Sequence, residues 1–309
     1  METMRVAASV CSSKRSLLEY IKSVSSDNAE DILYEFEVSS SLIDKDVVKA
    51  FSELYASVDI LVTDELCADG DIDKNNIAKN KAFVRKCALL NDAGLVFGFV
   101  FDAGAAQQKI QLSIKKIRAL IDFMIEQYPN HLQLECDSLK PSAVLSTQDI
   151  KSVRAFFHAA ETFYTYGRAV PWFLTVLEPL KIRPSVFLGD FAEWQRCNNC
   201  GFDSGFLPEN VPHTEIEKMI LNFVKLKYEE KKLPYVYPAA EDMIRLHGAF
   251  SRAAAEQTDT ILDLSYLPDD LFSPYAQDLK LFAGEVCMES CSIKVFSGRE
   301  GPDFCFMND

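Results

Sequence analysis

The stretch from Asn91 to Cys136 constrains the fold more than any other part of the chain, because two strand patterns flank one helix pattern. Residues 95–101 form a short apolar run rich in Val and Phe, which is typical of a buried strand. Residues 107–128 carry apolar side chains at three- and four-residue steps, which predicts an amphipathic helix. Residues 132–136 alternate between apolar and polar side chains, as a strand does. Together they predict a βαβ unit and therefore neighbouring parallel strands.

The same unit is repeated before this stretch. Residues 31–39 alternate cleanly in polarity, which predicts a strand. An amphipathic helix is expected at 44–55, a strand at 58–63 and a helix at 80–90. Residues 30–136 therefore predict four parallel strands joined by helices, which is half of a (β/α)₈ barrel or a doubly wound sheet of similar size.

After Leu139 the pattern changes to helices rich in aromatic residues, followed by short alternating runs. The expected helices span 149–166, 168–181, 185–194, 213–232 and 238–257, and the expected strands span 260–264, 279–282 and 292–296. The sequence thus predicts an α/β fold in three parts. These are an N-terminal helical lead-in (1–28), a partial (β/α) barrel of parallel strands (29–146), and a mainly helical C-terminal domain with a few short strands (147–309).

Composition narrows the classes of partner and compartment. The chain has 309 residues, and its net charge of -14 argues against binding to nucleic-acid phosphates. No apolar run approaches the ~20 residues that a membrane helix needs, and the N-terminus lacks the apolar core of a signal peptide. Most of the nine cysteines stand singly in apolar patterns, which favours a reducing compartment. We therefore expect a cytoplasmic protein that binds neither membrane nor nucleic acid.

Polar residues occupy one face of two predicted strands. Glu35 and Glu37 share a face of the first strand, and Gln133 and Glu135 share a face of the last. A closed, packed barrel has branched apolar residues inside, and a buried unpaired carboxylate is costly. The faces therefore indicate either an open barrel whose lumen holds a polar ligand or strands whose polar faces are exposed to solvent.

The cysteines offer the sharpest local motif. Cys197 and Cys200 form a CxxC pair, whose two thiolates can reach one tetrahedral zinc ion. Cys287 and Cys291 could complete a four-thiolate site. A redox pair or unpaired structural thiols remain alternatives to a zinc site.

Other known sequence motifs are incomplete or absent. The acidic loop that begins at Asp69 has Lys74 and Asn80 where a calcium-binding EF-hand needs glycine and glutamate, so we expect a solvated loop. No glycine-rich phosphate loop, GxSxG elbow or HExxH motif occurs. His213, just before two glutamates at a predicted helix start, is interpreted as a capping or surface residue.

Three phrases resemble the C-terminal half of a radical SAM barrel: YEFEVSSSLIDKDVVKAF, KAFVRKCALLNDAGLVFGFVFDAG and HLQLECDSLKPSAVL. The segment 156–194 resembles the helical domain that follows the barrel in some cobalamin-binding radical SAM proteins. The resemblance covers about 30–200, judged by these predicted elements. It implies a barrel fold and S-adenosylmethionine as a cofactor.

The chain departs from that family in its cluster motif. CxxxCxxC is missing, and Lys294 stands where a third cysteine would follow Cys287 and Cys291. The loop after Phe101 lacks the expected proline, and no cobalamin-binding DxHxxG occurs. Three cysteines are needed to hold a cluster with an open iron, so an iron–sulfur cluster is not expected in this chain alone. The resemblance therefore implies a C-terminal portion or subunit that closes the barrel and covers a polar ligand without being catalytically complete.

The resemblance also implies site residues and a partner. The candidate cofactor-binding residues lie near strand ends, where barrel sites sit: Glu35, Glu37, Thr63, Glu65, Asp102 and Glu135. Among them, Glu37 is expected to contact the amino or ribose groups of S-adenosylmethionine. A half barrel leaves open edges, so we expect another protein chain or self-association. Two alternatives remain: a non-catalytic binding or assembly protein with structural zinc at the CxxC pair, and an unrelated α/β enzyme that uses Glu35 and Glu37.

Overall fold

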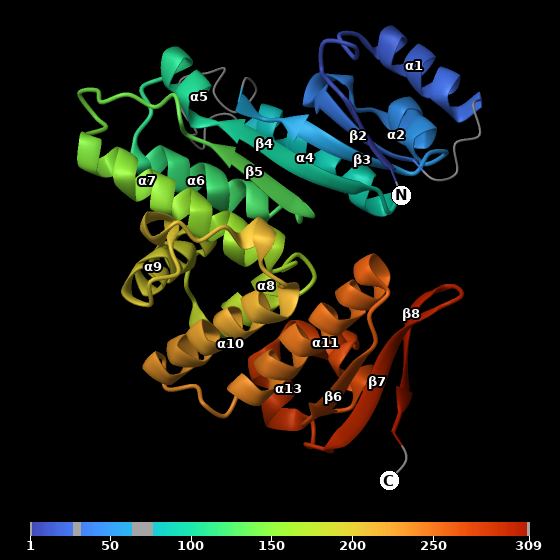
Figure 1. Ribbon diagram of the computed structural model, residues 1–309, viewed down its shortest axis with the longest axis vertical. Coiled ribbons are helices and arrows are strands. Elements are labelled where there is room, and N and C mark those ends of the chain that lie inside the picture. The colour runs from blue at the N-terminus through green and yellow to red at the C-terminus, as the bar shows by residue number, and fades with distance from the viewer. Residues whose placement is uncertain (1, 27–31, 64–76, 308–309) are drawn as a thin grey trace. The chain divides into compact units, whose positions relative to one another are not determined.

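A computed structural model of the chain describes residues 2–26, 32–63 and 77–307 (Figure 1). The chain forms two compact units, Met1–Phe157 and His158–Asp309, which are called here the first and second units. Helix α7 (Thr147–Ala160) runs across the boundary between the units. Each unit is described by itself.

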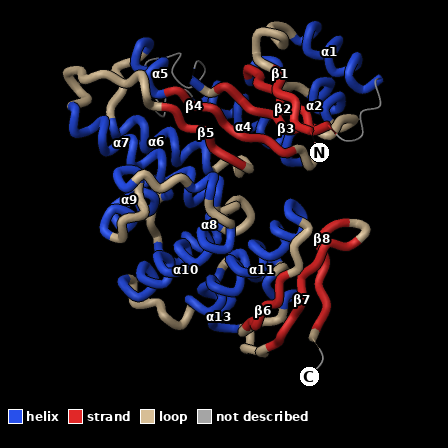
Figure 2. The backbone as a smooth tube through the Cα atoms, in the orientation of Figure 1, coloured by secondary structure: helices blue, strands red, loops and turns tan. Residues whose placement is uncertain are grey.

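The first unit is built around one sheet of five parallel strands, in the order β1-β2-β3-β4-β5. Figure 2 shows these strands in red within the first unit. The strands are β1 (Glu2–Val6), β2 (Ile32–Ser39), β3 (Ala56–Leu61), β4 (Val96–Asp102) and β5 (His131–Glu135). The helices are α1 (Lys14–Ser26), α2 (Lys45–Phe51), α4 (Ile77–Asp92), α5 (Ala103–Lys109), α6 (Ile114–Ile125) and α7.

The strand order matches the chain order, so successive crossovers of one hand place the helices on one face of the sheet. A doubly wound sheet would reverse its order instead. Phe36 in β2 contacts Tyr20 in α1 and Phe51 in α2 through its ring. Ring contacts also join β4 to α4 (Phe99–Phe83) and to α7 (Phe101–Phe157). The arrangement is that of an open, partial (β/α) barrel, and the expected α/β fold is confirmed.

Two details of the first unit differ from the sequence analysis. Residues 2–6 form β1, which pairs with β2, so the N-terminal part is a strand and a helix that belong to the sheet layer. A five-residue strand is too short to show a clear periodicity. The single helix expected at 107–128 is two helices, because Ile110 and Ser113 adopt extended conformations between α5 and α6. Ile110 and Leu112 are buried, so the apolar stripe continues through the break.

Short polar side chains begin several helices by accepting backbone hydrogen bonds. Asp44 Oδ1 accepts from the amides of Asp46 and Val47, at 3.0 and 3.1 Å, at the start of α2. Ser113 Oγ accepts from the amide of Lys116 at the start of α6. These caps explain why the helices start where they do.

The second unit is mainly helical, as expected. Its helices are a π-helical turn (Glu161–Tyr166), α8 (Phe173–Leu177), α9 (Pro184–Cys197), α10 (His213–Glu230), α11 (Tyr237–Glu256), α12 (Pro268–Leu271) and α13 (Leu279–Glu285). The fully buried Phe163 ring is the centre of its aromatic core. It contacts four other rings, with centroids 5.0–5.8 Å away: Trp172, Phe173, Phe187 and Phe191.

A small antiparallel sheet follows α11, in the order β6 (Thr260–Leu264), β7 (Cys291–Gly298) and β8 (Gly301–Phe306). The strand expected at 279–282 is wrong, since these residues lie in α13. Asp278 decides the local structure, because its Oδ1 accepts a hydrogen bond from the amide of Leu281 at 3.0 Å and caps the helix. Among the described helices, none combines the length and apolar character needed to cross a membrane.

Candidate functional site

The parallel sheet has one polar face, opposite the face on which the helices pack. In β2, Tyr34, Phe36 and Val38 are buried among the helices, while Glu35 and Glu37 on the other face are partly exposed. Strand register extends this second face across the sheet. We call it the polar face. Its ionisable side chains are Arg5, Glu35, Glu37, Asp59, Asp102, His131 and Glu135, and it also carries Gln133.

A row of paired residues crosses the middle of the polar face. Glu37 pairs in register with Asp59, Asp59 with Gly98, and Gly98 with His131. His131 Nε2 lies 2.6 Å from Asp59 Oδ1, so the imidazole reaches over β4 to join β5 with β3. Gly98 permits this contact, since a Cβ atom there would lie 2.1 Å from His131 Nε2.

An ion pair lies beside this row. Arg5 Nε donates a hydrogen bond to Glu35 Oε2 at 2.9 Å. The hydrogen bond and charge of Glu35, with smaller contributions from Asp59 and Glu37, raise the pKa of Arg5. Five carboxylates therefore share the polar face with one guanidinium and one imidazole, which favours ligand groups that donate hydrogen bonds or carry positive charge.

The predicted residues at the strand ends have different surroundings. Gln133 Nε2 donates to Glu135 Oε1 at 2.8 Å, and Glu135 is exposed. Thr63 Oγ1 accepts from the amide of Asp102 at 3.0 Å. Asp102 Oδ1 caps α5 by accepting hydrogen bonds from the amides of Gly104 and Ala105, so this oxygen is engaged by the helix start. Glu65 lies outside the described residues, as does the acidic loop at Asp69.

Sequence reasoning missed Asp59, His131 and the role of Gly98. The donor and acceptor are 72 residues apart, so no local spacing connects them. Two signals were nevertheless present. An isolated glycine inside a strand pattern indicates a close approach by another group, and His131 continues the alternation of Gln133 and Glu135 by one step. The polar face thus holds Glu35, Glu37 and Glu135 together with an Asp–His pair.

The predicted metal ligands are not assembled into one site. Cys197 is exposed at the end of α9, with its Sγ 3.7 Å from Glu193 Oε1. Cys200 Sγ lies 3.6 Å from the carbonyl oxygen of Gln195, and Cys291 Sγ lies 3.7 Å from that of Tyr266. Cys287 is exposed. No group of three or more His, Cys, Asp or Glu residues arranged to hold a metal ion occurs among the residues that the structure describes, so these thiols do not fit a four-ligand zinc site.

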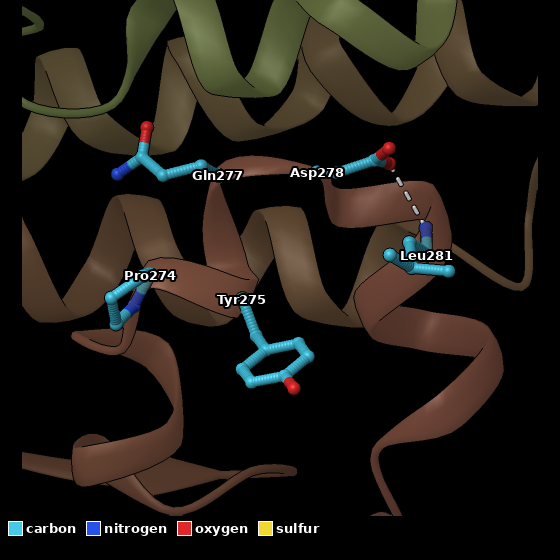
Figure 3. Close-up of a pocket in the computed structure, with 5 residues that line it drawn as sticks. All are labelled: Pro274, Tyr275, Gln277, Asp278 and Leu281. Atoms are coloured by element: carbon cyan, nitrogen blue, oxygen red, sulfur yellow. Dashed lines mark hydrogen bonds between the residues drawn. The ribbon is translucent and has the colours of Figure 1, made fainter.

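The second unit carries an open surface hollow of about 390 Å³. Figure 3 shows its lining residues, Pro274, Tyr275, Gln277, Asp278 and Leu281. The dashed line there marks the bond from the Leu281 amide to Asp278, so this carboxylate is committed to capping α13. The exposed Tyr275 and Leu281 make the hollow mainly apolar, and its described contacts bring no set of reactive groups together.

A buried ionic cluster joins α10 to α11 in the second unit. Arg252 Nη1 lies 2.7 Å from Glu217 Oε2 and 2.9 Å from His213 Nδ1. His213 is buried, so its interpretation as a capping or surface residue is wrong. A Cβ atom on Gly248 would lie 2.0 Å from Glu217 Oε2, so this glycine makes room for the cluster. Its close packing indicates a structural role.

Burial and two arginines, Arg168 and Arg252, lower the pKa of His213 to about 4. The folded state thus binds fewer protons than the unfolded state between about pH 4 and 6.5, and stability falls as the pH falls through this window. We expect His213 to cost about 2 kcal/mol of stability at pH 5 relative to pH 8. His213→Gln removes this contribution. Urea unfolding of both proteins at the two pH values, followed by tryptophan fluorescence, measures it; an unchanged pH dependence in the variant would contradict the assignment.

The chain was compared with protein-family models, with curated proteins and with solved structures, and no match was found in any of the three.

Proposed function

We propose that the first unit is a partial barrel whose polar face binds a polar ligand, and that the chain acts as a C-terminal portion or subunit of a radical SAM-like protein. The ligand expected from the sequence resemblance is S-adenosylmethionine. In this proposal Glu35, Glu37 and Glu135 face the ligand, whereas Asp102 contributes by holding α5. The iron–sulfur cluster belongs to another polypeptide or segment.

One observation carries the proposal: a parallel sheet whose helices lie on one face keeps partly exposed, ionisable side chains, such as Glu35, Glu37 and His131, on the other. A sheet that only needed to be soluble could use any polar residues there. This face instead carries both hydrogen-bond acceptors and donors, such as Glu37 and Arg5. Carboxylates suit the ammonium and hydroxyl groups of an aminoacyl nucleoside, since these groups donate hydrogen bonds.

The edges of the sheet support a partner. In the described part of the chain, β1 pairs only with β2 and β5 pairs only with β4. Each edge strand therefore offers backbone groups to a further strand, which a full barrel would supply. The proposed partner is a second protein chain, or a second copy of this chain, that completes the barrel and covers the ligand.

The test is isothermal titration calorimetry of the anaerobically purified protein with S-adenosylmethionine. The expected result is measurable binding that Glu37→Gln weakens about tenfold or more, because a charge-assisted hydrogen bond is replaced by a neutral one. Glu53→Gln is the matched control, since Glu53 is exposed between α2 and β3 and should leave the affinity unchanged.

Two results would contradict the proposal. Absence of binding by the wild-type protein, both alone and with a co-purified partner, would remove the expected ligand. Equal affinity of the Glu37→Gln and Glu53→Gln variants for S-adenosylmethionine would show that Glu37 on the polar face does not contact the ligand. Native mass measured on the same sample tests for association, which the open edges of the sheet predict.

A further inference from the structure

The contact between Asp59 and His131 depends on the geometry of the parallel sheet. The imidazole extends from β5 over β4, and the carboxylate lies on β3, so the contact spans two strand spacings. Any side chain larger than hydrogen at Gly98 would occupy the position of the His131 ring, whose three nearest atoms would lie 2.1–2.4 Å from a Cβ atom. Glycine therefore admits the imidazole to the middle of the face.

The Asp59 carboxylate fixes the tautomer of the His131 imidazole. A carboxylate 2.6 Å from Nε2 accepts the proton that this nitrogen carries, and Asp59 is buried while His131 keeps 29% of its side-chain exposure. A neutral imidazole with its proton on Nε2 has its lone pair on Nδ1. Within the described part of the chain, no hydrogen bond ends on that second nitrogen. The arrangement is an oriented base supported by a carboxylate.

The other three histidines differ in this respect. His213 Nδ1 faces Arg252, and His158 Nε2 bonds to the carbonyl oxygen of Phe206 at 2.8 Å. Burial lowers the pKa of His247 to about 4, and its ring packs against Phe272. In the structure, His131 is the histidine whose ring nitrogen is held by a carboxylate.

We infer that His131 is an acid–base residue of the polar face, with Asp59 and Gly98 as its positioning residues. This inference rests on the proposed function, in that the ligand lies on the same face. The group it recognises is an ammonium or hydroxyl group of the ligand. Nδ1 accepts the proton, the bonding electron pair stays on the ligand atom, and the Asp59 carboxylate compensates the charge of the imidazolium. Glu37, Glu35 and Arg5 are the other charged groups near this pair on the polar face.

The test uses diethyl pyrocarbonate, which acylates unprotonated imidazole nitrogens, with the site of labelling read by peptide mass spectrometry. At neutral pH, His131 should be labelled before His213 and His247. Asp59→Asn should slow the labelling of His131 about tenfold, because a neutral amide no longer fixes the tautomer that carries its lone pair on Nδ1. The expected slowing has a chemical cause, because the exposure of the ring is nearly unchanged in this isosteric variant.

Nuclear magnetic resonance of the imidazole nitrogens gives a second measurement, the tautomer of His131. A purely structural role of the Asp59–His131 pair would not require a particular tautomer. The wild-type protein should show His131 as a single tautomer protonated on Nε2. Gly98→Ala should give mixed tautomers, whereas Gly284→Ala, whose added methyl group meets open space, should not. Equal labelling rates in wild type and Asp59→Asn, or a proton on Nδ1, would overturn the inference. Both measurements are made without ligand, so a failure of S-adenosylmethionine to bind would contradict the proposed function alone.

Discussion

Arg252→Met is expected to lower the free energy of unfolding of the second unit by about 3–5 kcal/mol, because it leaves a buried carboxylate without its partner. Arg252 keeps 3% of its exposure, and its Nη1 lies 2.7 Å from Glu217 Oε2. Desolvation already raises the pKa of Glu217 against the opposing effect of Arg252. Urea unfolding followed by tryptophan fluorescence measures this unit selectively, since both tryptophans of the chain, Trp172 and Trp194, lie in it.

Two further variants make the cause of that loss specific. Lys218→Met removes an exposed charge from α10, the helix that carries Glu217, and should change stability by about 0.5 kcal/mol or less. The double variant Glu217→Leu/Arg252→Met should recover much of the loss, since a well-packed apolar pair often equals a buried ion pair. A double variant as unstable as the sum of its single variants would contradict the assignment of the loss to an uncompensated charge.

Phe163→Ala is the second large effect, with an expected loss of about 3–5 kcal/mol from the same unit. The Phe163 ring is fully buried and contacts four rings from α8, α9 and the segment before α8. Truncation removes these contacts and leaves a cavity that rigid aromatic neighbours fill poorly. The measurement is again the midpoint and slope of urea unfolding.

Phe202→Ala provides the matched aromatic control. Phe202 keeps 46% of its exposure, so its truncation should cost about 1 kcal/mol or less. If the two variants lost the same stability, the aromatic cluster around Phe163 would not be the core of the unit.

The parallel sheet was predictable because local and long-range patterns agree there. The alternation in β2 separates Tyr34, Phe36 and Val38 from Glu35 and Glu37, and the structure places the two sets on opposite faces. Repetition of strand and helix patterns then predicted parallel neighbours, since a crossover helix returns the chain in the same direction. In these strands and helices, the spacing of the apolar residues is enough to predict which face is buried.

Predictions failed where a few local contacts decide the structure. The apolar stripe runs past Ile110 and Leu112 without interruption, yet the caps at both ends of that segment split the expected helix. Residues 279–282 alternate like a strand, but the Asp278 side chain caps a helix there. Short elements carry too few residues for periodicity to outweigh a single capping bond.

The candidate site was predictable only in part for a related reason. Alternation identified Glu35, Glu37 and Glu135 from single strands. The contact between Asp59 and His131 depends on strand register across three strands and on the missing side chain of Gly98. Sequence periodicity predicts which face of the sheet a residue lies on, but it does not predict the residue's partner on a neighbouring strand. Such pairs can be identified only once the strand register is known.

Binding of S-adenosylmethionine to the polar face is tested by a map of amide chemical-shift changes, recorded during anaerobic titration of the isotope-labelled protein. The largest changes are expected on the polar face, at Glu37, Asp59, His131 and Glu135 in β2, β3 and β5. Residues around the hollow at Tyr275 should be unaffected. Changes confined to the second unit, or no changes at saturating ligand, would contradict the claim that the polar face of the partial barrel is the binding site.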